Sequence, residues 1–292
     1  MDSYRLYPST LINRGVSCWL NSIVQGLVSC PNFCQVIRKN IKKNMDNEVY
    51  HAFYSFMTLN QKGLLTDECS VRILESLNRL NRESMNSVKL AQNQMCSLDF
   101  LENVIEALHD PEITDLFTSK YVTETICTHC SKATCILTHH FYIGLKKTEL
   151  PDSKKYARDI VSRDIAIDAW KCPQCSLESF DIKATSRLIT CPKICIVQFD
   201  KINNTNVVSV TDHFGMSMTV GDYTRSLQYN IVSTICHYGP TTGGCYIANC
   251  LRKNPSDDLL SWYKLNDQNL SQEEGPLLDS SDIFMTIYML NE

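Results

Sequence analysis

The chain of 292 residues is long enough to bury a large hydrophobic core, and its net charge is −4. That balance excludes the polybasic surfaces with which proteins bind nucleic acid or anionic membranes. Met1–Thr10 is polar and lacks the apolar core of a signal peptide, and no run of residues approaches membrane-spanning length. With fifteen cysteines, we therefore expect a cytoplasmic or nuclear protein whose thiols are reduced and whose clustered cysteines bind metal.

The first predicted helix starts beside a cysteine. Apolar residues recur at helical spacing at Leu20, Ile23, Val24, Leu27 and Val28, which predicts an amphipathic helix. Ser17 is a suitable N-cap, so Cys18 falls in the first turn, where unpaired backbone N–H groups favour a thiolate. Two interpretations of Cys18 stay open: a reactive nucleophile, or a small residue that packs the helix onto a core.

Further helices are predicted at Val49–Leu59, at Val71–Leu80 and from about Leu98, with Pro111 closing the helical region. Strand-forming residues then dominate. Predicted strands cover Tyr121–Ile126, Thr134–Leu145, Asp181–Thr190, Ile194–Phe199 and Ile283–Leu290, and Lys146–Arg163 is a predicted exposed loop. The order of helices followed by strands indicates an α+β fold.

Two C-x-x-C pairs predict a structural zinc site. Cys127 and Cys130 form one pair, and Cys172 and Cys175 form the other. Each pair presents two thiolates from a tight turn, and together they complete a tetrahedral site. The separation is too long for a compact ribbon and suits two hairpins that meet at their tips. A redox dithiol and unligated cysteines are the alternatives, and His129 is left out because ring geometry inside the turn is poor for the same metal.

The segment Leu11–Ser22 resembles the cysteine box of the ubiquitin-specific proteases, whose pattern is close to G-L-x-N-x-G-N-T-C-Y-M-N-S. The cysteine, the preceding asparagine and glycine, and the following Asn-Ser match. Departures occur at Val16, Ser17, Trp19 and Leu20. The resemblance implies that Cys18 is the nucleophile of a thiol protease and that Asn13 stabilises the oxyanion, for which an asparagine amide is a suitable donor.

The segment from Tyr229 to Ala248 resembles the histidine box of the same family, with one replacement. His237 matches the first histidine, whereas Cys245 occupies the position of the second histidine, which is the catalytic base. Trp262–Asp267 resembles the family's W-Y-x-F-(D/N)-D segment. The resemblance therefore implies that Asn266 orients the base, with Asp267 beside it.

A thiol is a poor base in this role, because it carries no positive charge and donates only a weak hydrogen bond. His237 and Cys245 flank the same predicted hairpin loop, so they are expected to be cross-strand neighbours, and His237 is a possible substitute base. The alternative for His237 is a structural or substrate-contacting role.

The resemblance implies one catalytic-type domain over residues 1–292 with a papain-like fold. A helical thumb would extend to about residue 120, zinc-tipped strand fingers from about 121 to 190, and an antiparallel palm from about 191 to 292. Ubiquitin or a ubiquitin-like protein would be the partner. The sequence favours a ubiquitin-binding protein whose thiol isopeptidase activity is severely impaired or lost. An active deubiquitinase that uses His237 and a zinc-stabilised scaffold without ubiquitin binding are the alternatives.

Overall fold

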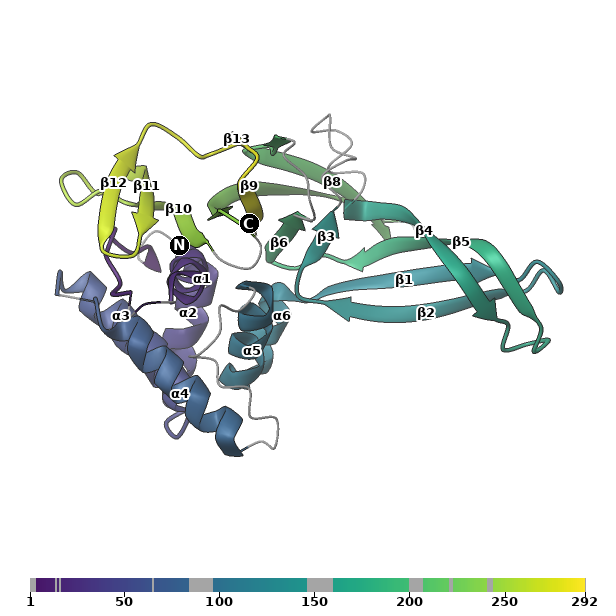
Figure 1. The fold of residues 1–292 in the computed structure, drawn as a ribbon, viewed down its shortest axis with the longest axis horizontal. Helices are drawn as coiled ribbons and strands as arrows, with labels where there is room; N and C mark the ends of the chain where they lie inside the picture. The colour runs from purple at the N-terminus through teal and green to yellow at the C-terminus, as the bar shows by residue number, and fades with distance from the viewer. Residues whose placement is uncertain are drawn as a thin grey trace.

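Helices occupy the first part of the chain and strands the rest. The computed structural model describes residues 4–13, 15, 17–64, 66–83, 97–145, 160–199, 207–220, 223–240 and 244–291. Figure 1 shows the helices gathered against one side of a large sheet, while a narrow second sheet projects away from both.

The helices pack around the first of them, α1. Their bounds are α1 (Cys18–Val28), α2 (Pro31–Asn40), α3 (Glu48–Gln61), α4 (Cys69–Glu83), α5 (Ser97–Leu108) and α6 (Pro111–Phe117). The helices predicted from periodicity at 20–28, 49–59, 71–80 and from 98 are confirmed as α1, α3, α4 and α5. Pro111 was expected to close the helical region, and this is wrong because it begins α6 instead. At the first position of a helix, proline has the right φ and its missing N–H removes no hydrogen bond.

The large sheet has eight strands in the order β12-β11-β10-β9-β14-β6-β3, with β8 paired to β9. These are β3 (Ile143–Leu145), β6 (Ile194–Phe199), β8 (His213–Val220), β9 (Tyr223–Tyr238), β10 (Cys245–Lys253), β11 (Leu260–Asn266), β12 (Asn269–Glu273) and β14 (Ile283–Leu290). All neighbours are antiparallel except β3 and β6.

The projecting sheet has four strands in the order β2-β1-β5-β4. They are β1 (Ser119–Ile126), β2 (Ala133–His140), β4 (Ser162–Lys171) and β5 (Glu178–Thr190), and a separate pair joins β7 (Val208–Ser209) to β13 (Asp279–Ser280). The β1–β2 and β4–β5 hairpins lie side by side because β1 pairs with β5.

Two predicted boundaries differ from the structure. The strand expected over 134–145 is split into β2 and β3, which belong to different sheets. The chain bends at Phe141 and Tyr142, and both side chains pack against the helical core. The loop expected over 146–163 ends earlier, because β4 already starts at Ser162, opposite Arg187 of β5. Residues 146–159 lie outside the described residues.

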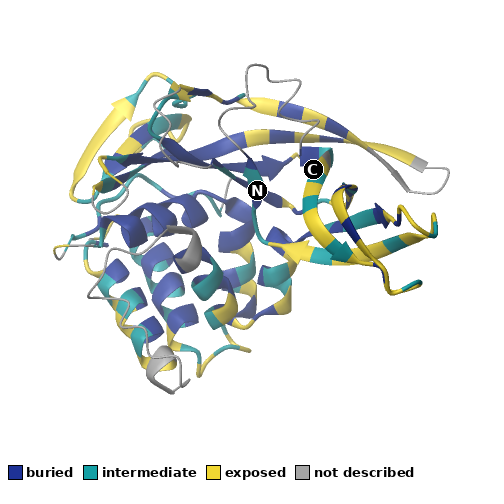
Figure 2. Cartoon of the chain, turned by 45° about the vertical axis from the view of Figure 1, so that its right-hand side comes forward, coloured by how far each residue is buried: buried dark blue, intermediate teal, exposed yellow. Residues whose placement is uncertain are grey.

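All eleven residues of α1 are buried, including its polar face. The predicted apolar stripe faces the core, and the polar side chains on the other face are enclosed by other parts of the chain. Gln25 donates from Nε2 to the carbonyl of Ser9 (2.8 Å). A Cβ added to Gly26 would lie 2.8 Å from Cδ1 of Ile287 in β14, so the helix lies directly on the sheet. Figure 2 shows the helices and the central strands as the most buried elements.

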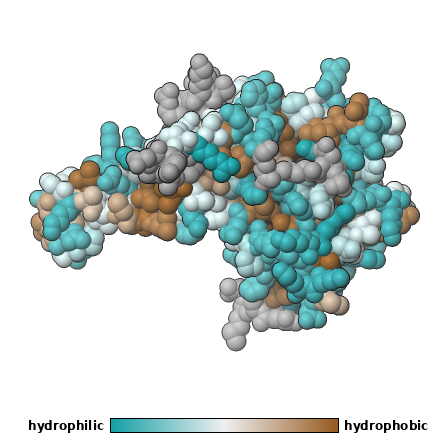
Figure 3. All heavy atoms as spheres, turned by 180° about the vertical axis from the view of Figure 1, so that it is seen from behind, coloured by the Kyte–Doolittle hydropathy of each residue, from teal (hydrophilic) through white to brown (hydrophobic). Residues whose placement is uncertain are grey.

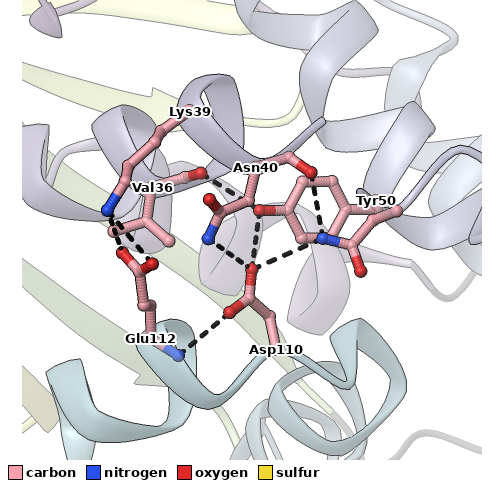
Figure 4. Close-up of polar contacts among 7 residues, drawn as sticks. Val36, Lys39, Asn40, Tyr50, Asp110 and Glu112 are labelled. Atoms are coloured by element: carbon pink, nitrogen blue, oxygen red, sulfur yellow. Dashed lines mark hydrogen bonds and ion pairs between the residues drawn. The ribbon is translucent and has the colours of Figure 1, made fainter. Parts of the chain in front are cut away.

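A buried carboxylate accepts hydrogen bonds from three helices (Figure 4). Asp110 accepts hydrogen bonds from Asn40 Nδ2 of α2 (3.0 Å), from the hydroxyl of Tyr50 in α3 (3.0 Å) and from the backbone N–H of Glu112 in α6 (2.9 Å). Asp110 is the N-cap of α6. Lys39 and Glu112 form an exposed ion pair nearby at 2.8 Å. Tyr50 has a raised pKa, because burial and the bond to Asp110 both favour its neutral form.

The projecting sheet is more exposed than the rest of the molecule. Its exposed apolar side chains are Ile126, Ile136, Leu137, Leu177, Phe180 and Ile189, and Figure 3 shows hydrophobic atoms on it from behind. None of the helices in the described parts of the chain has both the length and the apolar composition needed to cross a bilayer.

Candidate active site and metal centre

Cys18 is the first residue of α1 and only 5% exposed. Ser17 is at the N-cap position, as expected, but its side chain makes no capping hydrogen bond to the helix. Instead its backbone N–H and its hydroxyl both donate to Oδ1 of Asn13, at 3.1 and 3.2 Å. The expected cap is therefore wrong, because the Ser17 backbone (φ −98°, ψ 10°) is not in the extended conformation that aims an N-cap side chain at the helix N–H groups. Asn13 thus closes the loop that leads to Cys18.

Asp267 ties this loop to the sheet. Its carboxylate accepts from Nδ2 of Asn13 (2.8 Å) and from Nδ2 of Asn21 in α1 (2.7 Å), and its carbonyl accepts from the N–H of Leu11 (3.0 Å). Asp267 has a positive φ of 54° in the tight turn between β11 and β12, a conformation that aspartate tolerates. The carboxylate therefore fixes the positions of both asparagine amides relative to Cys18.

The structure brings Cys245 together with Asn266 and Cys18. Cys245 is the first residue of β10, and its Sγ donates to Oδ1 of Asn266 at 3.7 Å. Cys245 packs against the hydrophobic cluster that contains Cys18, and the carbonyl of the preceding residue, Gly244, is 4.0 Å from Cys18 Sγ. Burial, the charge of Cys18 and the Asp267 carboxylate raise the pKa of Cys245 to about 12. At neutral pH the side chain in this position is therefore an uncharged thiol.

Gly244 lies close to both His237 and Cys18. Its carbonyl is 4.0 Å from Cys18 Sγ. Its φ is +133°, and an added Cβ would lie 2.2 Å from the carbonyl of Tyr238 and 2.9 Å from Nε2 of His237. Only glycine fits here, and the imidazole of His237 therefore lies directly against this residue.

His237 is buried on β9, and the register differs from the expected one. Its direct cross-strand partner is Tyr246, whereas Cys245 pairs with Tyr238. Neighbouring residues of a strand point to opposite faces, so His237 and Cys245 are adjacent without being paired. The imidazole packs against the ring of Tyr246, with centroids 4.4 Å apart.

Two residues near the site received no role from the sequence. Asn21 matches the cysteine box, yet only the structure shows that its amide binds Asp267. The carbonyl of Gly244 near Cys18 likewise depends on how β10 approaches α1. The sequence signals were a polar residue in an apolar helix and a glycine before Cys245. Neither signal names its partner.

The four cysteines of the two C-x-x-C pairs meet at the tip of the projecting sheet. Their sulfur atoms all lie within 4.8 Å of one another. The Sγ atoms of Cys127 and Cys175 are 3.7 Å apart, and those of Cys130 and Cys172 are 3.8 Å apart. Four sulfurs held at about 2.3 Å around a tetrahedral zinc ion would be about 3.8 Å apart. The cluster could therefore hold a metal ion, and its donor set and spacing fit zinc.

The two turns have the same local geometry. The N–H of His129 donates to Cys127 Sγ, and that of Gln174 donates to Cys172 Sγ, both at 3.4 Å. Ser131 and Ser176 follow the turns with positive φ values of 56° and 60°. Backbone N–H groups, with that of Cys130 the strongest, lower the pKa of Cys127 to about 6. This favours the thiolate that a metal requires.

His129 lies apart from the cysteine cluster. Its Nε2 is 3.0 Å from the carbonyl of Glu178, and the group of potential ligands consists of the four cysteines alone among the described residues. Leaving His129 out of the site agrees with this geometry.

An α+β fold with a cysteine at a helix N-terminus beside a sheet-borne asparagine resembles the Cys-His-Asn arrangement of papain-like thiol proteases, with Cys245 rather than a histidine next to Asn266. The family model described as ubiquitin carboxyl-terminal hydrolase matches residues 9–290, so the chain belongs to this family. No curated protein matches the chain.

Solved structures share the fold over nearly the whole chain. The SAGA Ubp8/Sgf11/Sus1/Sgf73 DUB module bound to ubiquitin aldehyde matches with a TM-score of 0.75 and 16% identity, covering 99% of this chain and 70% of that one. A Ubp8 variant of the module bound to monoubiquitin gives 0.73 and 17%, covering 100% and 71%. The yeast module with an Sgf73 mutant gives 0.74 and 15%, covering 99% and 70%.

Proposed function

We propose that this chain binds ubiquitin or a ubiquitin-like protein and that its thiol isopeptidase activity through Cys18 is severely impaired or lost. The observation that carries the proposal is the position of Cys245, whose thiol donates to Asn266 and which follows Gly244, the residue whose carbonyl is 4.0 Å from Cys18 Sγ. In a working site, a base accepts the proton of the nucleophile and later protonates the leaving amine. A thiol that stays protonated at neutral pH performs neither step.

The remaining parts of the site support retention of the family architecture. Asn13 is proposed as the oxyanion donor, because one of its two amide N–H groups is oriented by Asp267 and the amide precedes the nucleophile in the same loop. Asn266 is proposed as the residue that would orient a base. Asp267 is proposed as a positioning residue, because its carboxylate accepts hydrogen bonds from the amides of Asn13 and Asn21 and acts on Cys18 only through these two side chains.

The alternative function is an active deubiquitinase that uses His237 as its base. The contact of this imidazole with Gly244, whose carbonyl lies near Cys18 Sγ, favours this alternative. Its packing against Tyr246 and its position one register step from Cys245 favour a structural role.

We further propose a structural zinc ion at Cys127, Cys130, Cys172 and Cys175, and a cytoplasmic or nuclear location. The support for the zinc ion is the cluster of four sulfur atoms within 4.8 Å of one another, and the support for the location is the clustering of cysteines in metal-binding rather than disulfide spacing. Zinc bound there would hold the tips of the two hairpins together. We assign this zinc no role in reactions at Cys18. We also propose that the domain divides into a thumb up to about residue 120, fingers from about 121 to 190, and a palm from about 191 to 292.

The test measures binding and catalysis separately on the same purified protein. Calorimetry with ubiquitin should show binding, while a fluorogenic ubiquitin substrate should be released slowly or not at all. Cys245→His should then increase ubiquitin release, because a general base typically contributes roughly 100- to 10,000-fold. The variant should still bind ubiquitin.

His237→Ala in the unmodified chain decides between the two functions. Loss of a measurable basal activity in this variant would overturn the impaired-protease proposal in favour of the His237 base. If Cys245→His releases no ubiquitin yet ubiquitin is bound, the chain is a binding protein. If ubiquitin is neither bound nor released, the proposal is wrong and only the scaffold alternative is left.

A further inference from the structure

Two thiols share the centre of the candidate active site. Cys18 begins α1 and Cys245 begins β10, and the residue before Cys245 has its carbonyl 4.0 Å from Cys18 Sγ. Cys18 belongs to the main hydrophobic cluster, and Cys245 packs against the same cluster. Cys18 is buried and Cys245 is partly exposed. The pair is therefore enclosed by protein and reachable by a small molecule from the side of Cys245.

The neighbours of Cys245 hold its thiol toward this centre. Its Sγ contacts Oδ1 of Asn266 at 3.7 Å and the carbonyl of Tyr246 at 3.6 Å. These two acceptors fix the position of the Cys245 sulfur beside Asn266. An imidazole at the same position offers no such sulfur, so the chemistry below is specific to the cysteine found here.

We propose that Cys18 and Cys245 form a reversible disulfide when the protein meets a hydroperoxide. The Cys18 thiolate attacks the peroxide, so that an S–O bond forms, the O–O bond breaks and the departing oxygen takes a proton. Cys245 then loses its proton and attacks the Cys18 sulfenic acid. The S–S bond forms, the S–O bond breaks and water leaves. Overall, two thiols lose two electrons and two protons, and hydrogen peroxide is reduced to two waters.

The local electrostatics support the second step. Burial contributes most to the raised pKa of Cys245, and the charge of Cys18 contributes next. The Cys18 contribution disappears once Cys18 is an uncharged sulfenic acid. Oxidation of the first thiol therefore makes the second easier to deprotonate, which is the order that the reaction needs.

Other cysteines near α1 are poor competitors. Cys30 and Cys34 are 0% exposed, and burial raises the pKa of both, that of Cys34 to about 12. The four cysteines at the tip of the projecting sheet lie on other elements. The disulfide between Cys18 and Cys245 is thus expected to form first near the site.

The test treats the full chain with limiting hydrogen peroxide, blocks free thiols with N-ethylmaleimide and identifies peptides by mass spectrometry without reduction. The expected product is a Cys18 peptide linked to a Cys245 peptide with the loss of two hydrogen atoms. A dithiol reductant should remove the link. Neither ubiquitin binding nor turnover enters this measurement, so its failure is distinct from failure of the proposed function.

Cys245→Ser supplies the critical comparison. Without the second thiol, the sulfinic form of Cys18 should increase severalfold at the same peroxide dose, because nothing resolves the sulfenic acid. Cys135→Ser, which removes an exposed thiol on β2, is the matched control and should leave the linked peptide unchanged. Absence of the linked peptide in the unmodified chain, or equal sulfinic fractions with and without Cys245, would overturn the proposal.

Discussion

An imidazole and a thiol differ in the charge that they can carry at the position of Cys245. An unperturbed histidine has a pKa of about 6.5 and gains a positive charge when it takes the proton of a nucleophile. The Cys245 thiol, with a pKa raised to about 12, is neutral at pH 7 and becomes negative only when it loses its proton. The thiol donates a hydrogen bond to Asn266 as an imidazole in this position could, but it cannot accept the proton of Cys18 as an imidazole would.

Alkylation rates should distinguish Cys18 from the other thiols near α1. We expect limiting iodoacetamide to label Cys18 faster than Cys30 or Cys34, because burial raises the pKa of those two thiols and keeps them protonated at neutral pH. Mass spectrometry after short exposures measures the three rates. Equal rates would show that the start of α1 is not open to small reagents.

At the scale of elements, the stability of the projecting sheet is expected to depend on the cysteine cluster at the tips of its two hairpins. The β1–β2 and β4–β5 hairpins pair through β1 and β5, and much of this sheet is exposed (Figure 2). A sheet with little core of its own gains stability from a shared metal site. The helices have a separate and larger core.

Zinc removal should therefore act locally. Structural zinc contributes on the order of 10 kcal/mol in small domains, with a smaller visible effect where other contacts hold the strands. We expect a strong chelator to speed hydrogen exchange in the described strands of residues 121–190, which are mainly β1, β2, β4 and β5, while α1 to α6 keep their protection. Elemental analysis of protein purified without chelators should show one zinc per chain. Absence of zinc would contradict the assignment.

Among the helices, Asp110 is the joint, because its carboxylate accepts hydrogen bonds from α2, α3 and α6 (Figure 4). Asp110→Ala leaves the buried amide of Asn40 without its acceptor, leaves the Tyr50 hydroxyl only the carbonyl of Val36, and removes the cap of α6. The free energy of unfolding should fall by about 3 kcal/mol, measured by urea denaturation. Lys39→Ala is the control, because its exposed ion pair with Glu112 is screened by water and contributes little to stability. Equal losses for the two variants would argue against a joint at Asp110.

At the scale of the molecule, α1 connects the helices to the eight-stranded sheet. Arg252 of β10 is 1% exposed and reaches the other end of α1. Its guanidinium donates to the carbonyl of Gln25 (2.7 Å), to Oε1 of Gln25 (3.0 Å) and to the hydroxyl of Ser29. Cys18 at the start of α1 and Arg252 at its end thus fix the helix along β10.

Arg252→Met should loosen this connection. The substitution leaves the buried Oε1 of Gln25 without its donor and removes the guanidinium bonds to the Gln25 carbonyl and the Ser29 hydroxyl, which then keep only each other. We expect a loss of about 3 kcal/mol in unfolding free energy. Arg252→Lys should recover little, because an ammonium cannot match the planar fork of a guanidinium. Lys264→Ala, which removes an exposed side chain of β11, is the control. Urea denaturation measures all three, and full recovery by lysine would contradict the role of the fork.

The sequence by itself determined the features that depend on short spacing. Helical periodicity placed α1, α3, α4 and α5, and the C-x-x-C pairs identified the four cysteines that the structure brings within 4.8 Å. The family resemblance rests on two segments, Leu11–Ser22 and Tyr229–Ala248, which match family motifs and occur in the same order along the chain. Each of these signals lies within a few residues of chain, where local geometry decides.

Only the tertiary structure decided which distant groups meet. The bonds from Asp267 to Asn13 and Asn21, and the pairing of His237 with Tyr246, join residues by register and approach rather than by spacing. The start of α6 at Pro111 depends on Asp110, whose carboxylate also serves α2 and α3. Cys245 lies near Cys18 because α1 lies directly on the sheet, and packing of a helix on strands is not encoded in either segment alone.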